Sequence, residues 1–161
     1  MINSTSNRQV KRVAGLRGKA KVRREEGMFE AEGLRMCREL SPGEVDTLFV
    51  TEDFQKDREN RRWLTHFQYE TVTDVLMKSM ADTQSPQGVL AIVRQRNYSL
   101  EDILSTPLKQ ALLILETLQD PGNLGTILRA GEGAGITGVI MNRETADIYN
   151  PKVIRSTMGS I

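Results

Sequence analysis

Short apolar runs alternate with charged, amphipathic stretches along most of this chain. The apolar runs predict strands at residues 45–50, 88–93, 111–116 and 138–141, and weaker ones at 28–32 and ending near Thr71. The stretches between them predict helices that start near Ser6 and Asn150 and helices at residues 34–40, 54–66, 74–80 and 123–134. Strands that alternate with helices indicate an α/β fold.

The apolar run at residues 111–115 has no polar alternation, which is typical of a strand buried on both faces of a parallel sheet. A turn at Pro121 and Gly122 follows, and then a helix that carries Asn123 and Arg129. Ligands of open α/β sheets bind at the carboxyl ends of the strands. Asn123 and Arg129 are therefore candidates for chemistry, the alternative being a helix cap region and a surface arginine.

A polar stretch with a proline, residues 97–107, indicates a domain boundary. We therefore predict one domain at residues 1–97, a linker at 98–108 and a second domain at 109–161. The second domain has a strand, a helix, a strand and the start of another helix, too little to cover both faces of a parallel sheet. We expect it to be an incomplete domain.

The charge is unevenly distributed. The 161 residues carry a net charge of +1, but residues 1–24 hold eight basic side chains and no acidic one, which leaves −7 for the remainder. A basic end on an acidic chain favours a polyanionic partner such as a nucleic acid, bound through its phosphates, over a merely solvated helix face. The candidate phosphate contacts in this segment are Arg8, Lys11, Arg12, Lys19, Lys21, Arg23 and Arg24.

Several other classes of site are disfavoured. Residues 133–138 match the G-x-G-x-x-G pattern, but they follow a predicted helix and precede a strand, the reverse of a dinucleotide fingerprint. With a single histidine, His66, and no cysteine cluster, we expect no metal site. Trp63 and Phe67 are expected to pack together. Cys37 is expected to be a small buried residue.

One cysteine and the lack of an apolar signal segment predict a cytoplasmic protein without a membrane span.

Residues 120–129, DPGNLGTILR, followed by Ala134 and Gly135, resemble the first signature motif of the SpoU/TrmH family of RNA ribose 2′-O-methyltransferases. Residues 150–160, NPKVIRSTMGS, resemble the segment that follows it in the family, and residues 8–93 resemble the small RNA-binding domain that often precedes the catalytic one. The resemblance implies a small N-terminal α/β RNA-binding domain and the first part of a parallel-sheet, trefoil-knot methyltransferase domain.

The resemblance also implies that the cofactor is S-adenosylmethionine and that the intact protein is a homodimer. It implies an RNA substrate, and ribosomal RNA is favoured over transfer RNA. The family's second and third motifs, with most of the cofactor pocket, are expected beyond Ile161, so no cofactor-binding residue is identified. Arg155 is a further candidate for RNA contact.

In the family, the arginine that matches Arg129 is thought to act at the ribose hydroxyl. Because a guanidinium stays protonated, we favour a phosphate anchor and leave a role as base open. Asn123 is expected to hold Arg129 or the turn in place. The alternatives are a non-catalytic RNA-binding protein that kept the fold, a transfer-RNA methyltransferase and, more weakly, a small-nucleotide enzyme.

Overall fold

The computed structural model describes residues 1–105 and 109–161. They form two compact units, Met1–Arg94 and Gln95–Ile161, and each is described here by itself. The predicted linker at 98–108 includes residues 106–108, which lie outside the described residues.

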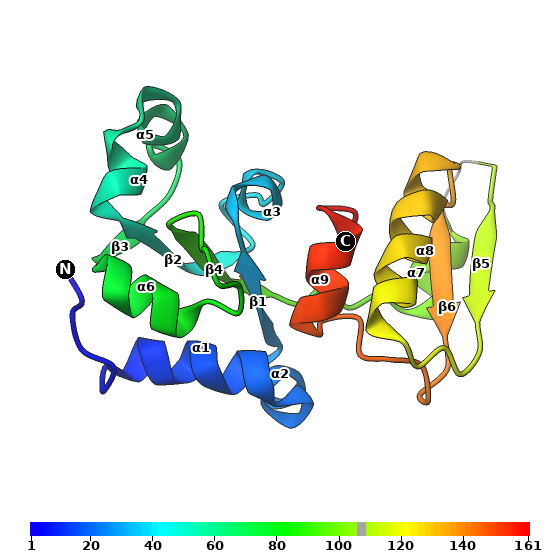
Figure 1. The fold of residues 1–161 in the computed structure, drawn as a ribbon. Helices are drawn as coiled ribbons and strands as arrows, with labels where there is room; N and C mark the ends of the chain where they lie inside the picture. Colours follow the sequence, from blue (N-terminus) through cyan, green and yellow to red (C-terminus); the bar gives the residue numbers. More distant parts are fainter. Residues whose placement is uncertain (106–108) are drawn as a thin grey trace. The chain divides into compact units, whose positions relative to one another are not determined.

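The first unit is built on a four-stranded mixed sheet (Figure 1). Strand β4 (Val89–Arg94) lies between β1 (Met28–Glu32) and β2 (Val45–Thr51) and is antiparallel to both. Strand β3 (Tyr69–Val72) pairs in parallel with β2 at the edge. The central strands are buried on both faces, which explains their continuous apolar runs.

Helices cover both faces of this sheet (Figure 1). Their bounds are α1 (Arg8–Gly18), α2 (Ala20–Glu26), α3 (Leu34–Arg38), α4 (Glu52–Lys56), α5 (Arg58–Leu64) and α6 (Asp74–Met80). Helices α1 and α6 pack on the face that presents Phe49, Leu90 and Ile92, and these side chains form one buried core. Helix α3 packs against β1 and β4.

Several predicted helix boundaries differ in the structure, most clearly at α1 and at residues 54–66. Helix α1 is capped by Asn7, whose side chain accepts a hydrogen bond from the Gln9 N–H at 2.8 Å, rather than by Ser6. The helix predicted at 54–66 is two helices, because Asp57 has an extended backbone and its carboxylate caps α5 by accepting from the Asn60 N–H at 2.9 Å.

The second unit contains α7 (Leu100–Leu104), β5 (Leu112–Leu115), α8 (Pro121–Gly133), β6 (Gly138–Met141) and α9 (Pro151–Thr157). Strands β5 and β6 are parallel, with Leu112 opposite Gly138. Leu124 and Leu128 of α8 and Val153 of α9 form the core, against which residues of both strands pack.

The prediction that the 111–116 strand is buried on both faces is wrong for the described structure. Ile114 is 73% exposed, and the other residues of β5 are half-buried. The reason is that the core formed by α8 and α9 packs against Leu115 and Val139 on one face of the sheet, whereas Ile114 alternates with Leu115 and points to the other face. The prediction for residues 133–138 is confirmed, since α8 ends at Gly133 and β6 begins at Gly138.

Cys37 is a core residue, as predicted. Its side chain is fully buried on α3, and its thiol donates to the Ala31 carbonyl at 3.6 Å. Burial, and secondarily the charge of Glu32, raise the pKa of this thiol to about 12, so it stays protonated and unreactive at neutral pH. Trp63 and Phe67 pack against each other, with their ring centroids 4.7 Å apart.

No helix within the described residues is long and apolar enough to cross a membrane.

Candidate functional site

The turn from β5 into α8 places Asn123 in the first turn of the helix. The Asp120 carboxylate accepts from the Asn123 N–H at 2.7 Å, and Pro121 occupies the first helical position, where no N–H is needed. Asn123 is exposed, at the carboxyl end of β5. This is the edge where the sequence predicted a ligand.

Arg129 lies between one and two turns further along α8. It is six positions beyond Asn123, about 9 Å along the helix axis. Its Nη1 donates to Met158 Sδ at 2.9 Å, and Met158 follows α9 in a left-handed conformation with φ 55°. Arg129 thus lies beside the end of α9, and its support by Asn123 stays a prediction.

Helices α8 and α9 are in close contact at Gly125. A Cβ on Gly125 would lie 2.3 Å from the Ser156 Cβ and 2.7 Å from the Val153 carbonyl oxygen. At the other end of α8, Glu132 accepts a hydrogen bond from the Ser160 hydroxyl. These contacts fix the position of Arg129 relative to the segment after α9. The half-buried Arg155 lies on α9 itself.

The sequence pattern does not single out Asn142, the residue directly after β6. The Asn142 side chain bonds to Thr117, Glu144 and Thr145, and so connects the loop before α8 to the loop before α9. In the sequence, Asn142 stands out only by its position directly after a predicted strand. That position does not reveal the hydrogen-bond partners of its side chain.

Most of the predicted phosphate contacts lie at the surface of the first unit. Arg8, Lys11, Lys19 and Arg24 are exposed, and none has an ion pair within residues 1–105 and 109–161. Lys21 is exposed and lies 3.7 Å from the Glu25 carboxylate, a weak surface pair. These side chains are accessible to an anionic partner.

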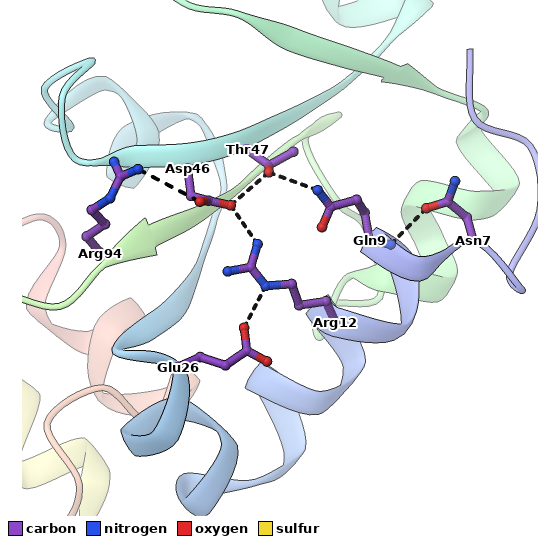
Figure 2. Close-up of polar contacts among 7 residues, drawn as sticks. All are labelled: Asn7, Gln9, Arg12, Glu26, Asp46, Thr47 and Arg94. Carbon is purple, nitrogen blue, oxygen red and sulfur yellow. Dashed lines mark hydrogen bonds and ion pairs between the residues drawn. The ribbon is translucent and has the colours of Figure 1, made fainter.

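Arg12 instead belongs to a polar network between α1, the end of α2 and strand β2 (Figure 2). Its Nε donates to Glu26 and its Nη1 to Asp46, both at 2.6 Å. Asp46 also accepts from the Thr47 hydroxyl at 3.0 Å and lies 3.9 Å from Arg94. With its charge balanced by two carboxylates, Arg12 joins α1 to the sheet.

Arg23 also makes contacts within its own unit. It is 3% exposed, and its Nη1 donates to the carbonyl oxygens of Leu16 at 2.6 Å and Arg17 at 3.2 Å. Arg17 in turn donates to the carbonyls of Met80 and Ala81, at the end of α6. Both side chains satisfy carbonyl groups near helix ends, which is a structural role.

The network around Arg12 predicts a pH-dependent contribution to stability. Burial by itself raises the pKa of the Asp46 carboxyl, but hydrogen bonds from Arg12 and Thr47 and the nearby positive charges lower it below its usual range. The stabilisation is therefore present above the pKa of an unfolded aspartate, about 3.9, and is lost as the pH falls through the lower folded value.

We expect Asp46→Asn to reduce the free energy of unfolding by about 1 kcal/mol at pH 7. Urea unfolding at several pH values measures the difference from the wild type, which should shrink as the pH falls below about 4. Asp53→Asn on α4, whose exposed carboxylate pairs with Lys56 at 2.5 Å, serves as a surface control. An Asp46→Asn difference that does not change with pH would contradict this interpretation.

A cavity of about 650 Å³ lies within the second unit. Its lining includes Leu128, Val139, Ile148 and Tyr149. The Tyr149 hydroxyl accepts from the Arg96 N–H at 3.0 Å and donates to the Arg96 carbonyl at 2.8 Å. Arg129 does not line this cavity, and the described residues contain no group of three potential metal ligands.

The fold and the capped turn at residues 120–129 together define a class of protein: an α/β unit on a mixed sheet, followed by the start of a second α/β unit with a parallel strand pair and a helix that begins after the carboxyl end of a strand. Two family models match accordingly, the MRM3-like substrate binding domain over residues 7–91 and the SpoU rRNA Methylase family over residues 110–161. The chain belongs to the SpoU rRNA methylase family and carries an MRM3-like substrate binding domain.

Similar proteins are known from several organisms. The chain is 31% identical to the 23S rRNA (guanosine(2553)-2′-O)-methyltransferase RlmP of Bacillus subtilis, over 99% of this chain and 61% of that protein. It is 30% identical to the mitochondrial rRNA methyltransferase 3 of Xenopus laevis, over 96% of this chain and 38% of that protein. The chain thus spans 61% or less of the length of these relatives.

Solved structures are similar as well. The crystal structure of an AdoMet-bound rRNA methyltransferase from Sinorhizobium meliloti superposes with a TM-score of 0.81 at 31% identity, over 99% of this chain and 60% of that one. The SpoU methyltransferase AviRb from Streptomyces viridochromogenes, in complex with AdoMet, gives 0.81 at 25% identity, over 96% and 60%.

Proposed function

We propose that the complete protein transfers a methyl group from S-adenosylmethionine to a ribose 2′-hydroxyl in RNA, and that this RNA is ribosomal rather than transfer RNA. The observation that carries the proposal is the turn at residues 120–129, where a capped α8 starts at the carboxyl end of β5 and carries Asn123 and Arg129. The names of the relatives, two of them rRNA methyltransferases, support the choice of RNA.

The two parts of the chain have different roles in this proposal. Residues 1–97 bind the RNA substrate, residues 98–108 link the parts, and residues 109–161 begin the methyltransferase domain. The complete protein acts in the cytoplasm, in agreement with its single cysteine. It acts as a homodimer, as the family resemblance implies.

Arg129 positions the acceptor. Methyl transfer requires the ribose oxygen in line with the methyl group, so holding the ribose is a large part of catalysis. The planar guanidinium of Arg129 can grip the phosphate beside the target ribose with two parallel hydrogen bonds. Because a guanidinium stays protonated at neutral pH, we assign Arg129 to the phosphate, while Asn123 supports the turn.

S-adenosylmethionine supplies the methyl group in this proposal. The cavity of the second unit does not fit it, because a methyl donor must lie beside the acceptor and Arg129 does not line that cavity. No cofactor contact is therefore assigned to the described residues.

The accessible basic residues contact RNA phosphates. The set is Arg8, Lys11, Lys19, Lys21 and Arg24. Arg155 on α9 is a further candidate for RNA contact, although it is half-buried and its Nη1 atom is buried. Arg12 and Arg23 are left out of it because their guanidinium groups bond within the first unit.

Phosphate contacts make RNA binding sensitive to salt. We expect the affinity for an RNA fragment to fall steeply between about 50 and 200 mM salt, because each contact releases bound counterions. Lys11→Ala and Lys19→Ala should each lower the slope of log K against log [salt] by about 0.7, the value for single-stranded RNA. Fluorescence anisotropy titrations measure both quantities.

Lys56→Ala is the matched control, since Lys56 is an exposed lysine of the same unit that pairs with Asp53. It should leave the slope unchanged. An affinity that does not depend on salt, or equal effects of all three substitutions, would rule out the assigned phosphate contacts.

Calorimetry separates the enzyme from an RNA-binding protein that has only kept the fold. Titrating S-adenosylmethionine into the complete protein should give saturable heat of binding. The absence of binding, with RNA affinity intact, would favour the non-catalytic alternative.

A further inference from the structure

The connection between β5 and α8 contains a residue in an unfavourable backbone conformation. Thr117 has φ 55°, in the left-handed region, which a β-branched side chain rarely adopts. It lies three residues before Asp120, the cap of α8. Because such conformations persist only where surrounding contacts enforce them, a specific partner is expected nearby.

Asn142, the residue after β6, is that partner. Its Oδ1 accepts from the Thr117 N–H at 3.0 Å, and its Nδ2 donates to the Thr117 hydroxyl at 3.1 Å. One side chain thus bonds to both the backbone and the side chain of Thr117. The two contacts define the orientation of that peptide group.

Asn142 is itself held firmly. Its Nδ2 also donates to the Glu144 carboxylate at 2.8 Å, and its Oδ1 accepts from the Thr145 N–H at 3.1 Å and the Thr145 hydroxyl at 2.8 Å. Both amide hydrogens of Asn142 are therefore used, and neither an aspartate nor an alanine can make the same set of bonds.

A backbone contact continues this connection. The Ala146 N–H donates to the Leu118 carbonyl at 2.8 Å, one residue beyond Thr117. The loop before α8 is consequently attached to the loop before α9 at two successive residues. The loop before α9 thereby sets where α8 begins.

We infer that Asn142 is a positioning residue for the candidate site: by holding Thr117 in its left-handed conformation, it sets the start of α8 and thus the placement of Asn123 and Arg129. The inference rests on the proposed function for its effect on catalysis. Since a displacement of about 1 Å can cost about 100-fold in rate, a small shift of α8 is enough to matter.

Asn142→Ala in the complete protein tests it. We expect kcat for methyl transfer to fall between about 10- and 100-fold, with the KM for S-adenosylmethionine within about twofold of the wild type. Adding Thr117→Gly to this variant should recover at least about a third of the decrease in log kcat, because glycine adopts the left-handed conformation without steric strain. Arg143→Ala, at the exposed neighbouring position, should behave like the wild type.

A second pair of variants covers the case in which Asn142→Ala does not fold. Asn142→Asp keeps the size and the acceptor but places a carboxylate beside Glu144, so kcat should fall. Glu144→Gln added to it should restore part of the activity, since the new amide can donate to the aspartate. A wild-type kcat in either single variant, or a loss that neither second substitution reverses, would overturn the inference.

Hydrogen exchange separates this inference from the proposed function. The Thr117 amide should be protected in the wild type and exchange faster in Asn142→Ala. If the wild type transfers no methyl group, the proposed function fails, and the exchange at Thr117 still decides whether Asn142 holds the loop. Equal protection in both proteins would contradict the inference.

Discussion

Arg129→Ala in the complete protein is expected to lower methyl transfer by about 100-fold or more while leaving S-adenosylmethionine binding intact. The side chain projects from the third turn of α8 and lies beside Met158, exposed at the surface. An interaction that positions the reacting hydroxyl is worth about 100-fold or more in rate. Incorporation of labelled methyl groups into RNA measures the rate, and calorimetry measures the binding of the cofactor.

Arg129→Lys provides the sharper comparison. It keeps the positive charge but loses the planar pair of donors, so it should also transfer methyl groups poorly. Arg143→Ala controls for the loss of a surface arginine in the same unit. Undiminished turnover by Arg129→Ala would exclude Arg129 from the site, and full activity of Arg129→Lys would reduce its role to that of a point charge.

Gly125→Ala is expected to destabilise the second unit strongly. The new methyl group would overlap the Ser156 side chain and the Val153 carbonyl, whose nearest atoms lie 2.3 and 2.7 Å from the ideal Cβ position. Because one of these contacts is backbone, α9 has to move away from α8. Overpacking of this kind costs about 1–3 kcal/mol, which differential scanning calorimetry detects as a lower Tm.

Gly133→Ala is the matched control in the same helix. No heavy atom other than those of its chain neighbours and its own helix backbone lies within 4 Å of its Cβ position, and alanine is the better helix former. It should therefore raise the stability by about 0.5–1 kcal/mol. Equal effects of the two substitutions would show that helix propensity, rather than the contact between α8 and α9, determines the role of Gly125.

The sequence predicted elements best where apolar runs are bounded by turn residues. The strands at 28–32 and 138–141 and the helix at 74–80 have the predicted bounds. Asp57 was harder to place, because an aspartate inside a charged stretch is equally suited to a helix surface and to a cap. The burial of β5 was overestimated, since it depends on which elements pack on each face of the sheet, and a run of apolar residues does not show that.

The candidate site was predicted only in part. The capped turn and Asn123 followed from local patterns, which depend on residues a few positions apart. The roles of Arg12 and Asn142 did not, because their partners Asp46 and Thr117 lie 34 and 25 residues away in the sequence. A composition of eight basic residues likewise cannot distinguish exposed lysines from Arg23, which bonds to carbonyl groups within its own unit.

The most direct test of the proposed function is the product of the reaction. The complete protein is incubated with methyl-labelled S-adenosylmethionine and unmodified ribosomal RNA, and a parallel reaction contains transfer RNA instead. The RNA of each reaction is then digested to nucleosides. We predict label in a 2′-O-methylated nucleoside from ribosomal RNA, and none with Arg129→Ala. An unlabelled RNA, or label on a base instead of a ribose, would contradict the account.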